Sequence, residues 1–495
     1  MTFLGVDIGT ASSKAVVTSA DGDILARASR PHTTSSPKPG WFEHDADGVW
    51  WAETLALIAE VGGTVALGDV DAVGVSGIGP AIVVTDANGS PLRPGILYGI
   101  DTRAGVEIAE LTDLLGADTL LAVTGNRLTT QAVGPKLAWL AHHEPDVWAR
   151  ARRWYSSSGY IVGRLTGEYV IDHYTVSASD PLDDIETQEW WPPGWAACAP
   201  SLEQPRTAWP DEIIGVVTPA AAAETGLPVA TPVVAGTIDA MAESYSAGCV
   251  EFGDTMVMYG STLFFIQVVA HPPRHPGLWA VGGRHPGLYG IAAGMATSGL
   301  VTTWLADIAG SDVGELLKAA ASVPAGSNGL VMLPYLSGER TPLFDAEARG
   351  CWIGLTLRHG RAELARSVLE GVAYGVRHNI ETMADAGSPP RRLVAVGGGT
   401  RGTLWTQIVS DVTGLPQDLP TITIGASYGD ARMAADALGV DTAAWNPVAE
   451  RIEPAGGAVA ETYDTLYGVY RRAYAALRDD MHVLARRSGE TDTAT

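Results

Sequence analysis

An acid, three hydroxyl groups and a lysine lie within eight residues near the start of the chain. The stretch reads Asp7-Ile8-Gly9-Thr10-Ala11-Ser12-Ser13-Lys14 and continues a short apolar run. Hydroxyl, amide and ammonium donors beside a close-packing glycine suit the phosphates of a metal-bound polyphosphate, with Asp7 near Mg²⁺. An ordinary polar β-turn explains the same residues, and the stretch lacks the Gly-Lys-Ser/Thr of a Walker A loop.

A second acid follows a glycine-threonine turn. The segment is Gly236-Thr237-Ile238-Asp239-Ala240, and apolar residues continue after it. An aspartate in this position can cap a helix, or it can act as a general base. The spacing alone favours the cap.

Two further motifs carry less information on their own. Gly397-Gly398-Gly399 follows an apolar run and would let a flat ligand lie against the backbone, although triple glycines also occur in plain turns. Asp101 and Arg103 would point the same way on a strand, where they could bind a polar substrate or face water. The histidines of the sequence form no nucleophile or metal-binding pattern.

Short apolar runs separated by glycine turns place these motifs on strands. Residues 3–26 contain three such runs, which predict an antiparallel meander. Residues 255–266 show the same pattern, two apolar runs separated by the turn Gly260-Ser261-Thr262, which is weak evidence for a duplication. Further strands are expected at 70–77, 82–85 and 393–396, and helices at 47–61, 135–143 and 362–383. Strands that alternate with helices indicate an α/β architecture.

Composition and charge exclude several classes of function. Of the 495 residues, 46% are hydrophobic, which allows two or more large cores and argues against disorder. Lysine and arginine number 32 against 56 aspartates and glutamates, and this net charge of −24 argues against a general binder of nucleic acid or anionic membranes. The three cysteines are too far apart for a disulfide framework or a metal pair. With no signal peptide or membrane-spanning run evident, a cytoplasmic globular protein is expected.

In their order and spacing, these motifs resemble the FGGY carbohydrate kinases, the sugar-kinase branch of the actin/hexokinase-like ATPases. The resemblance covers about residues 1–440 and is most specific in the second half, at 333–342, 350–355 and 363–371. The segments at 7–14, 236–240, 260–262 and 397–399 also match, as do those at 40–45, 135–140 and 164–168.

The resemblance implies two α/β domains of RNase H-like topology with a cleft between them. The expected domains are a sugar-binding one at 1–245 and an ATP-binding one at 246–440, followed by a helical extension and tail at 441–495. The implied reaction is in-line phosphoryl transfer from MgATP to a sugar hydroxyl, with Asp239 as general base. Asp7 and Asp239 would contact the metal.

The resemblance also implies which residues contact each substrate. Nucleotide contacts are expected from Thr10, Ser12, Ser13, Lys14, Gly260, Ser261, Thr262, Gly397, Gly398 and Gly399. Sugar contacts are expected from Gly79, Pro80, Asp101, Arg103 and Asp239.

The sugar-facing loops depart from the family pattern. Within the family the chain most resembles the xylulokinases, which carry a Met-His pair where this sequence has Ile78-Gly79-Pro80. Pro80 replaces a sugar-binding histidine, so hydroxyl recognition is expected to change. The tryptophan that usually precedes Asp-x-Arg is also replaced, in the segment Leu97-Tyr98-Gly99-Ile100-Asp101.

From the resemblance to xylulokinases, the expected acceptor is a ketopentose such as D-xylulose. Because the sugar-facing loops differ, gluconate, another ketose or a polyol are alternatives. A catalytically silent sugar- or ATP-binding regulator is the alternative from another class, and such a protein would have little reason to keep Asp239. The expected partners are the small sugar and MgATP, without nucleic acid or membrane. Homodimers are common in the family, although the sequence indicates no interface.

Overall fold

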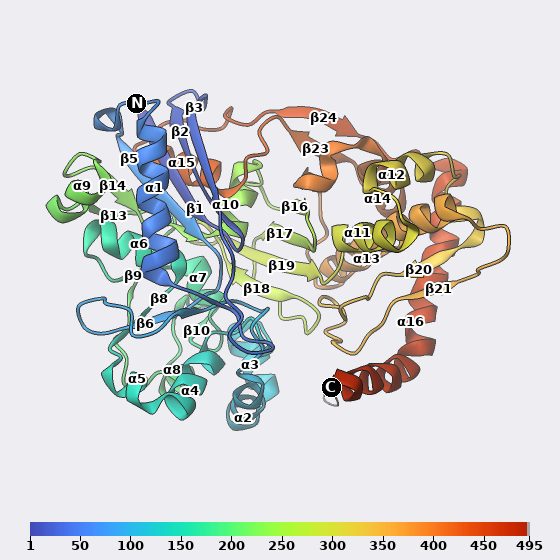
Figure 1. Cartoon of the computed structure of the whole chain (residues 1–495), viewed down its shortest axis with the longest axis horizontal. Coiled ribbons are helices and arrows are strands. Elements are labelled where there is room, and N and C mark those ends of the chain that lie inside the picture. Colours follow the sequence, from blue (N-terminus) through green and yellow to red (C-terminus); the bar gives the residue numbers. More distant parts are fainter. Residues whose placement is uncertain (493–495) are drawn as a thin grey trace. The chain divides into compact units, whose positions relative to one another are not determined.

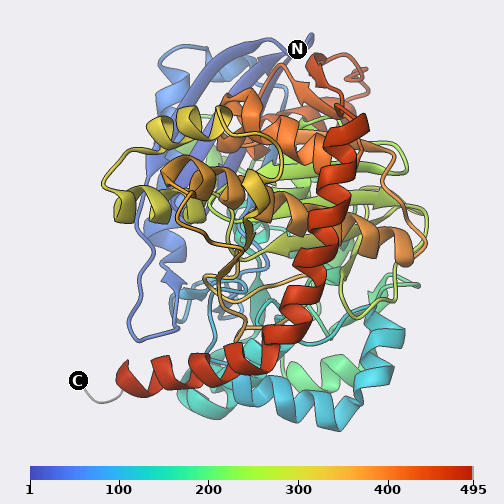
Figure 2. The same ribbon diagram turned by 90° about the vertical axis from the view of Figure 1, so that its right-hand side faces the viewer.

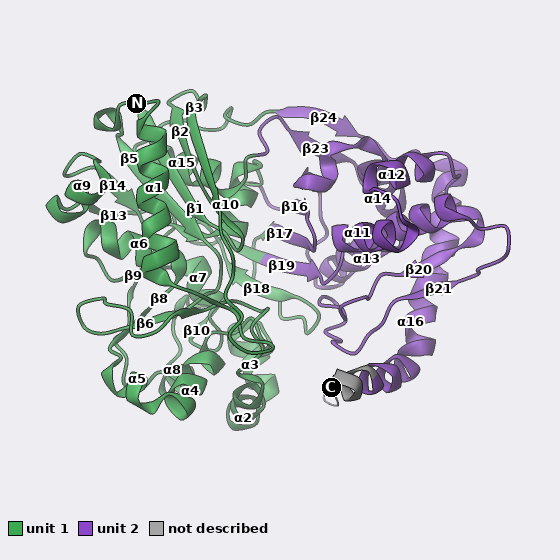
Figure 3. Cartoon of the chain, viewed as in Figure 1, with its two compact units in different colours: residues 1–250, 268–290, 424–447 green, residues 251–267, 291–423, 448–495 purple. Residues whose placement is uncertain are grey.

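The computed structural model describes residues 1–492, so the last three residues of the tail expected at 441–495 lie outside it. The chain forms two compact units, each built from three separate segments (Figure 3). Unit 1 comprises residues 1–250, 268–290 and 424–447, and unit 2 comprises residues 251–267, 291–423 and those from 448 onward. Within the described residues, no helix has the length and apolar character needed to cross a membrane.

A mixed sheet forms the centre of unit 1 (Figure 1). It contains β1 (Thr2–Ile8), β2 (Ser12–Ser19), β3 (Ile24–Pro31), β5 (Ala72–Gly77), β13 (Ile213–Val216), β14 (Pro232–Val234) and β15 (Thr237–Ile238). The strand order is β13-β14-β5-β1-β2-β3, and β15 also pairs with β5. Strands β1, β2 and β3 form the predicted antiparallel meander, and β5 runs parallel to β1. Leu4, Val6 and Val17 are fully buried, so the apolar runs of the sequence form the core here.

Helices pack on this sheet, and one of them approaches it unusually closely. They are α1 (Ala52–Gly62), α6 (Ser157–Thr166), α9 (Pro219–Thr225), α10 (Asp239–Ser246) and α15 (Ala426–Ala437). A Cβ added at Gly74 of β5 would clash with the carbonyl oxygen of Asp430 on α15, and one added at Gly429 would clash with that of Ala242 on α10. Helix α15 therefore packs in unit 1 with β5 and α10, although the sequence-based division gave its residues to the C-terminal domain.

A second cluster of buried side chains in unit 1 lies among short elements. Leu137, Trp154 and Leu182 belong to this cluster. The helices of this region are α2 (Gly105–Leu115), α3 (Ala117–Thr124), α4 (Gly134–His143), α5 (Pro145–Arg150), α7 (His173–Ser177) and α8 (Pro192–Cys198). Short strands of the unit are β4 (Glu43–His44), β6 (Val83–Thr85), β7 (Gly95–Ile96), β8 (Arg153–Tyr155), β9 (Val170–Asp172), β10 (Asp183–Asp184), β11 (Glu189–Trp190), β12 (Arg206–Ala208) and β18 (Trp279–Gly282). A π-helical turn, η1 (Ala46–Trp51), leads directly into α1.

Unit 2 has a central sheet of the same design. Its strands are β16 (Asp254–Tyr259), β17 (Leu263–Val269), β19 (Tyr289–Met295), β22 (Arg392–Val396), β23 (Gln417–Pro420) and β24 (Val448–Ile452). They follow the order β19-β17-β16-β22-β23-β24, with β16 antiparallel to β17 and parallel to β22. The order matches that of β3-β2-β1-β5 in unit 1, and β16 pairs with β17 and β22 as β1 pairs with β2 and β5, so each unit has the predicted RNase H-like sheet and the duplication hypothesis gains support.

The helices of unit 2 pack largely on one another. They are α11 (Gly299–Ala309), α12 (Val313–Ala321), α13 (Arg361–Asp385), α14 (Thr403–Thr413) and α16 (Gly457–Asp492), and a small hairpin pairs β20 (Val331–Leu333) with β21 (Cys351–Ile353). Figure 2 shows α16 in red over its described length. Helix α13 buries every residue from Ala365 to Val376 and thus all of its sides, which fits the long helix predicted at 362–383.

Candidate active site

Asp7 lies near the end of β1 and is only 5% exposed. It is paired with Lys14 across the antiparallel ladder, so the two side chains are neighbours on one face of the sheet. Ser76 stands beside it on β5, and its Oγ donates to Asp7 Oδ1 at 3.3 Å. Burial raises the pKa of Asp7 to about 6, although Lys14 and the serine hydroxyl act in the opposite direction. A buried carboxyl group of this kind is stabilised in its charged form by an added cation.

Asp239 is the first residue of α10 and follows the short strand β15. The N-cap position belongs to Ile238, so Asp239 is not the cap that the spacing favoured. Its Oδ1 accepts a hydrogen bond from the Ala240 N–H at 2.7 Å. Burial, followed by the negative charge of Asp7, raises the pKa of Asp239 well above its usual range. One turn further on, burial raises the pKa of Glu243 to about 7.

A third aspartate, Asp430 on α15, joins this site and was not expected from the sequence. Its Oδ2 accepts a hydrogen bond from Ser76 Oγ at 2.7 Å. Its Oδ1 is buried and has no hydrogen-bond partner among the described residues. Burial and the charge of Asp7 raise the pKa of Asp430 well above its usual range. The available signal was a charged residue inside a helix whose other residues are mostly small and fully buried.

The mutual effects on pKa place Asp7, Asp239 and Asp430 in one acidic cluster of unit 1, beside Lys14. Such a cluster can accept a proton or attract a divalent cation. Among the described residues, no group of three or more His, Cys, Asp or Glu side chains is arranged to enclose a metal ion. Mg²⁺ needs only one or two carboxylates, because water and substrate phosphates complete its shell, so Asp7 and Asp239 fit this ion.

The turn between β1 and β2 carries the first group of expected phosphate contacts. The Gly9 N–H donates to the Ser12 carbonyl at 3.1 Å, which makes the turn tight. Thr10, Ser12 and Lys14 remain partly exposed. Ser13 differs, because it is fully buried and its hydroxyl donates to Glu53. The Ser13 side chain is therefore used inside the protein, contrary to the expectation that it faces a phosphate.

The second group of expected nucleotide contacts surrounds a pocket of about 570 Å³ in unit 2. Gly260, Ser261, Gly398 and Gly399 line this pocket, together with Lys318, Arg401 and the ring of Trp405. Thr262 and Gly397 are not among the lining residues but hold adjacent turns: the Thr262 carbonyl accepts from the Gly260 N–H at 3.0 Å, and Gly397 has a φ of +92°. A Cβ at Gly397 would lie 2.7 Å from the carbonyl oxygen of Tyr259, so this position needs glycine.

Asp101 and Arg103, which the resemblance assigns to the sugar, form an ion pair with each other. They do not lie on a strand, and both side chains are fully buried. Arg103 donates to both carboxylate oxygens of Asp101 and also to Glu43 at 2.8 Å. The Trp41 ring covers the guanidinium at 4.2 Å. The two side chains thus hold a loop of unit 1 together in this structure.

The loop that departs from the xylulokinase pattern lies beside the element that carries Asp239. A Cβ at Gly79 would clash with the side chain of Ile238, the residue before Asp239. Pro80 is buried in the same loop. The structure therefore brings Gly79 next to the residue that precedes Asp239.

The comparisons with known proteins cover nearly all of this chain. The model of the N-terminal domain of the FGGY family of carbohydrate kinases matches residues 2–244, and the model of the C-terminal domain matches residues 255–438. The xylulose kinase of Escherichia coli (strain K12) is 30% identical over 437 residues, which cover 87% of this chain and 89% of that protein. The glycerol kinase of Nocardia farcinica (strain IFM 10152) is 30% identical over 88% of this chain and 89% of its own length.

Solved structures agree with the sequence comparisons. The crystal structure of xylulose kinase from Rhodospirillum rubrum superimposes with a TM-score of 0.91 at 36% identity. The match covers 97% of this chain and all of that chain.

Proposed function

The chain belongs to the FGGY family of carbohydrate kinases, and from this premise we propose that it transfers the γ-phosphate of ATP to a hydroxyl group of a sugar, with Asp239 as general base. The observation that supports this role most directly is the position of Asp239, partly buried at the start of α10 and electrostatically coupled to Asp7. A carboxylate with a raised pKa accepts a hydroxyl proton more readily than an ordinary aspartate. In the proposed reaction, ionised Asp239 takes this proton as the oxygen attacks phosphorus.

Asp7 and Asp239 are the residues that would hold Mg²⁺, through one or two direct or water-mediated contacts. When bound, this ion neutralises charge on the phosphates of ATP. Lys14 lies next to Asp7 on the neighbouring strand and adds a fixed positive charge. Thr10 and Ser12 offer hydroxyl donors from the turn between the two strands.

The pocket of unit 2 is the proposed site for the nucleoside part of ATP. Its glycine turns present backbone to a flat ligand, because no side chain intervenes at Gly398 or Gly399. Trp405 supplies an aromatic wall, and Lys318 and Arg401 supply positive charge for phosphates.

For the acceptor, we propose a ketopentose such as D-xylulose, since two of the similar proteins are xylulose kinases. The loop at Gly79 and Pro80 departs from the xylulokinase pattern and favours the alternative acceptors, namely gluconate, another ketose or a polyol. Proline has no N–H and no polar side-chain group, so it cannot donate the hydrogen bond that a histidine would give to a sugar hydroxyl.

ADP release with MgATP, measured against a panel of ketoses, aldonates and polyols, tests this proposal. One acceptor should give turnover well above the reaction with water. Asp239→Asn should lower that turnover by about 10²–10⁴-fold, the usual contribution of a general base, while ATP binding measured by calorimetry stays intact. Near-normal turnover in this variant would remove Asp239 as the base.

The same assay separates the enzyme from a silent regulator. A wild-type protein that binds ATP and a sugar, yet releases no ADP with any acceptor, would support the regulator and contradict the proposed transfer. Turnover with an aldonate or polyol but not with D-xylulose would keep the reaction and replace the acceptor.

A further inference from the structure

His32 follows β3 and contacts the turn that carries the first phosphate contacts. Its Nε2 lies 3.2 Å from the carbonyl oxygen of Gly9, and its Nδ1 lies 2.8 Å from Oε2 of Glu53 on α1. The His32 and Glu53 side chains are only 6% and 15% exposed. The same carboxylate oxygen also accepts from the Ser13 hydroxyl.

Both ring nitrogens of His32 thus face oxygen acceptors. A neutral imidazole donates from one nitrogen and accepts at the other, so it can satisfy only one of these two contacts. We propose that His32 is an imidazolium held by Glu53, and that it acts as a positioning residue that fixes the first phosphate-binding turn and places a positive charge beside it. The negative charge of Glu53 offsets the cost of burying a charged ring.

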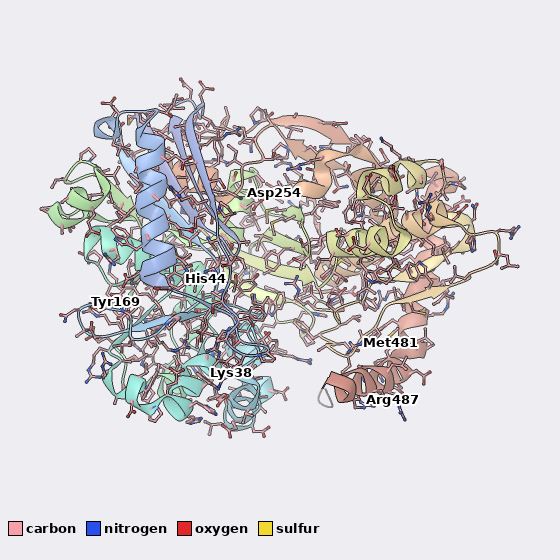
Figure 4. All side chains as sticks on the ribbon, viewed as in Figure 1. Lys38, His44, Tyr169, Asp254, Met481 and Arg487 are labelled. Carbon is pink, nitrogen blue, oxygen red and sulfur yellow. The ribbon has the colours of Figure 1, made fainter. Side chains whose placement is uncertain are left out.

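His44 on β4, labelled in Figure 4, shows the opposite arrangement. Its Nδ1 accepts from Trp50 Nε1 at 3.2 Å, so its hydrogen is on Nε2, which lies 3.1 Å from Thr34 Oγ1. Burial lowers the pKa of His44 to about 4, and the neighbouring His32 acts in the same direction. The two rings meet edge to face at 5.0 Å, so one charged and one neutral ring avoid mutual repulsion.

The two histidines hold successive carbonyl groups of one turn. His32 donates to Gly9, and Thr34, which receives the hydrogen of His44, donates to the Thr10 carbonyl at 3.0 Å. The positive charge of His32, fixed next to this turn, attracts a polyphosphate that binds to the turn. The inference rests on the proposed function, because it assumes that the turn binds the phosphates of ATP.

Nitrogen-15 NMR of the full-length protein, labelled at histidine, measures the protonation state without any activity. At pH 7.5 and without nucleotide, both ring nitrogens of His32 should give the shifts of an imidazolium. His44 should give the two distinct shifts of a neutral ring and serves as the internal control, and His32→Gln and His44→Gln assign the signals. A neutral pattern for His32 would overturn the proposal.

Glu53→Gln separates the charge from the hydrogen bonds. The amide nitrogen can donate to Nδ1 of His32, so the ring becomes neutral while its Nε2 continues to donate to Gly9. In Glu53→Gln and in His32→Gln, the positive charge beside the turn is lost, so the KM for MgATP should rise about tenfold while the KM for the sugar stays constant. An unchanged KM for MgATP in Glu53→Gln would overturn the role of the charge.

The two measurements also distinguish failure of this inference from failure of the proposed function. An active wild-type enzyme with a neutral His32 would refute the inference alone. A wild-type protein without phosphotransfer, in which His32 is an imidazolium, would refute the proposed function while supporting the charge on His32.

Discussion

At the scale of single residues, the hydrogen bonding of the acidic cluster depends on the single hydroxyl hydrogen of Ser76. Ser76 Oγ lies 2.7 Å from Oδ2 of Asp430 and 3.3 Å from Oδ1 of Asp7, yet it can donate to only one of them at a time. A protonated Asp430 satisfies both contacts, because it donates to Ser76, which then donates to Asp7. The raised pKa of Asp430 agrees with this arrangement.

Asp430→Asn tests this protonation state through stability. An amide reproduces the donor of a neutral carboxyl group and carries no charge, so the cost of keeping Asp430 buried at high pH disappears. We expect unfolding to require about 1–2 kcal/mol more at pH 8 and to change little at pH 5. Urea denaturation at both pH values measures the difference.

Asp436 on the same helix provides the matched control. Its carboxylate accepts from Arg284 at 2.8 Å and from Thr442 at 2.6 Å, so it is a paired charge. Asp436→Asn should therefore destabilise unit 1 at pH 8, by about 1–3 kcal/mol. A loss of stability at pH 8 in Asp430→Asn as well would show that Asp430 is ionised in the folded protein.

At the scale of elements, the close approach of α15 determines where Asp430 lies. Gly74→Ala would place a Cβ against the Asp430 carbonyl and push the helix away from β5. We expect a loss of about 1–3 kcal/mol in unfolding free energy, together with lower phosphotransfer, because Asp430 moves with the helix backbone. Gly105→Ala is the control, since a Cβ at the start of α2 would meet nothing within 4 Å and should leave stability and turnover unchanged.

The hydrophobic pattern of the sequence predicted most helices and strands, but it did not predict that α15 packs closely on β5. Alternating apolar runs indicated the meander of β1 to β3, and helical spacing indicated α13, because burial follows the period of each element. The small residues of α15 gave no comparable signal: a helix that is buried on all sides has no polar face to reveal its partner. The packing of α15 on β5 depends on a glycine far away in the sequence, Gly74.

At the scale of the whole molecule, the same reasoning explains which site residues were predictable. Asp7 lies near the end of a recognisable strand and Asp239 follows a recognisable turn, so motif order was sufficient to select them. Asp430 enters the site only through long-range packing, which a single sequence does not reveal. Arg103 was selected by its motif, yet its partner Glu43 comes from a separate segment, and their ion pair could not be foreseen.

Buried carboxyl groups with raised pKa values occur in both units. Burial is the first cause for each: the pKa is about 6 for Asp7 and Asp172, about 7 for Asp180, Glu243 and Glu339, and well above the usual range for Asp183, Asp239 and Asp430. In the folded chain such a group holds a proton at a pH where the unfolded chain has released it. Its contribution to stability is therefore complete below the unfolded pKa, about 4, and is lost as the pH rises from there to the raised pKa.

We consequently expect the Tm to rise as the pH falls from about 8.5 to about 4.5. Burial lowers the pKa of Lys136 to about 7 and opposes this rise, but it is one group against several carboxyls. His44 also opposes the rise as a single group: burial lowers its pKa to about 4, so below about 6.5 the unfolded chain gains a proton that the folded chain does not. Calorimetry in buffers of equal ionic strength measures the profile, and Asp430→Asn should flatten it between pH 8.5 and 6.5. A wild-type Tm that climbs steadily from pH 6 to 8.5 would mean that these carboxyls are ionised in the folded protein, and that compensating cations rather than protons stabilise the acidic cluster.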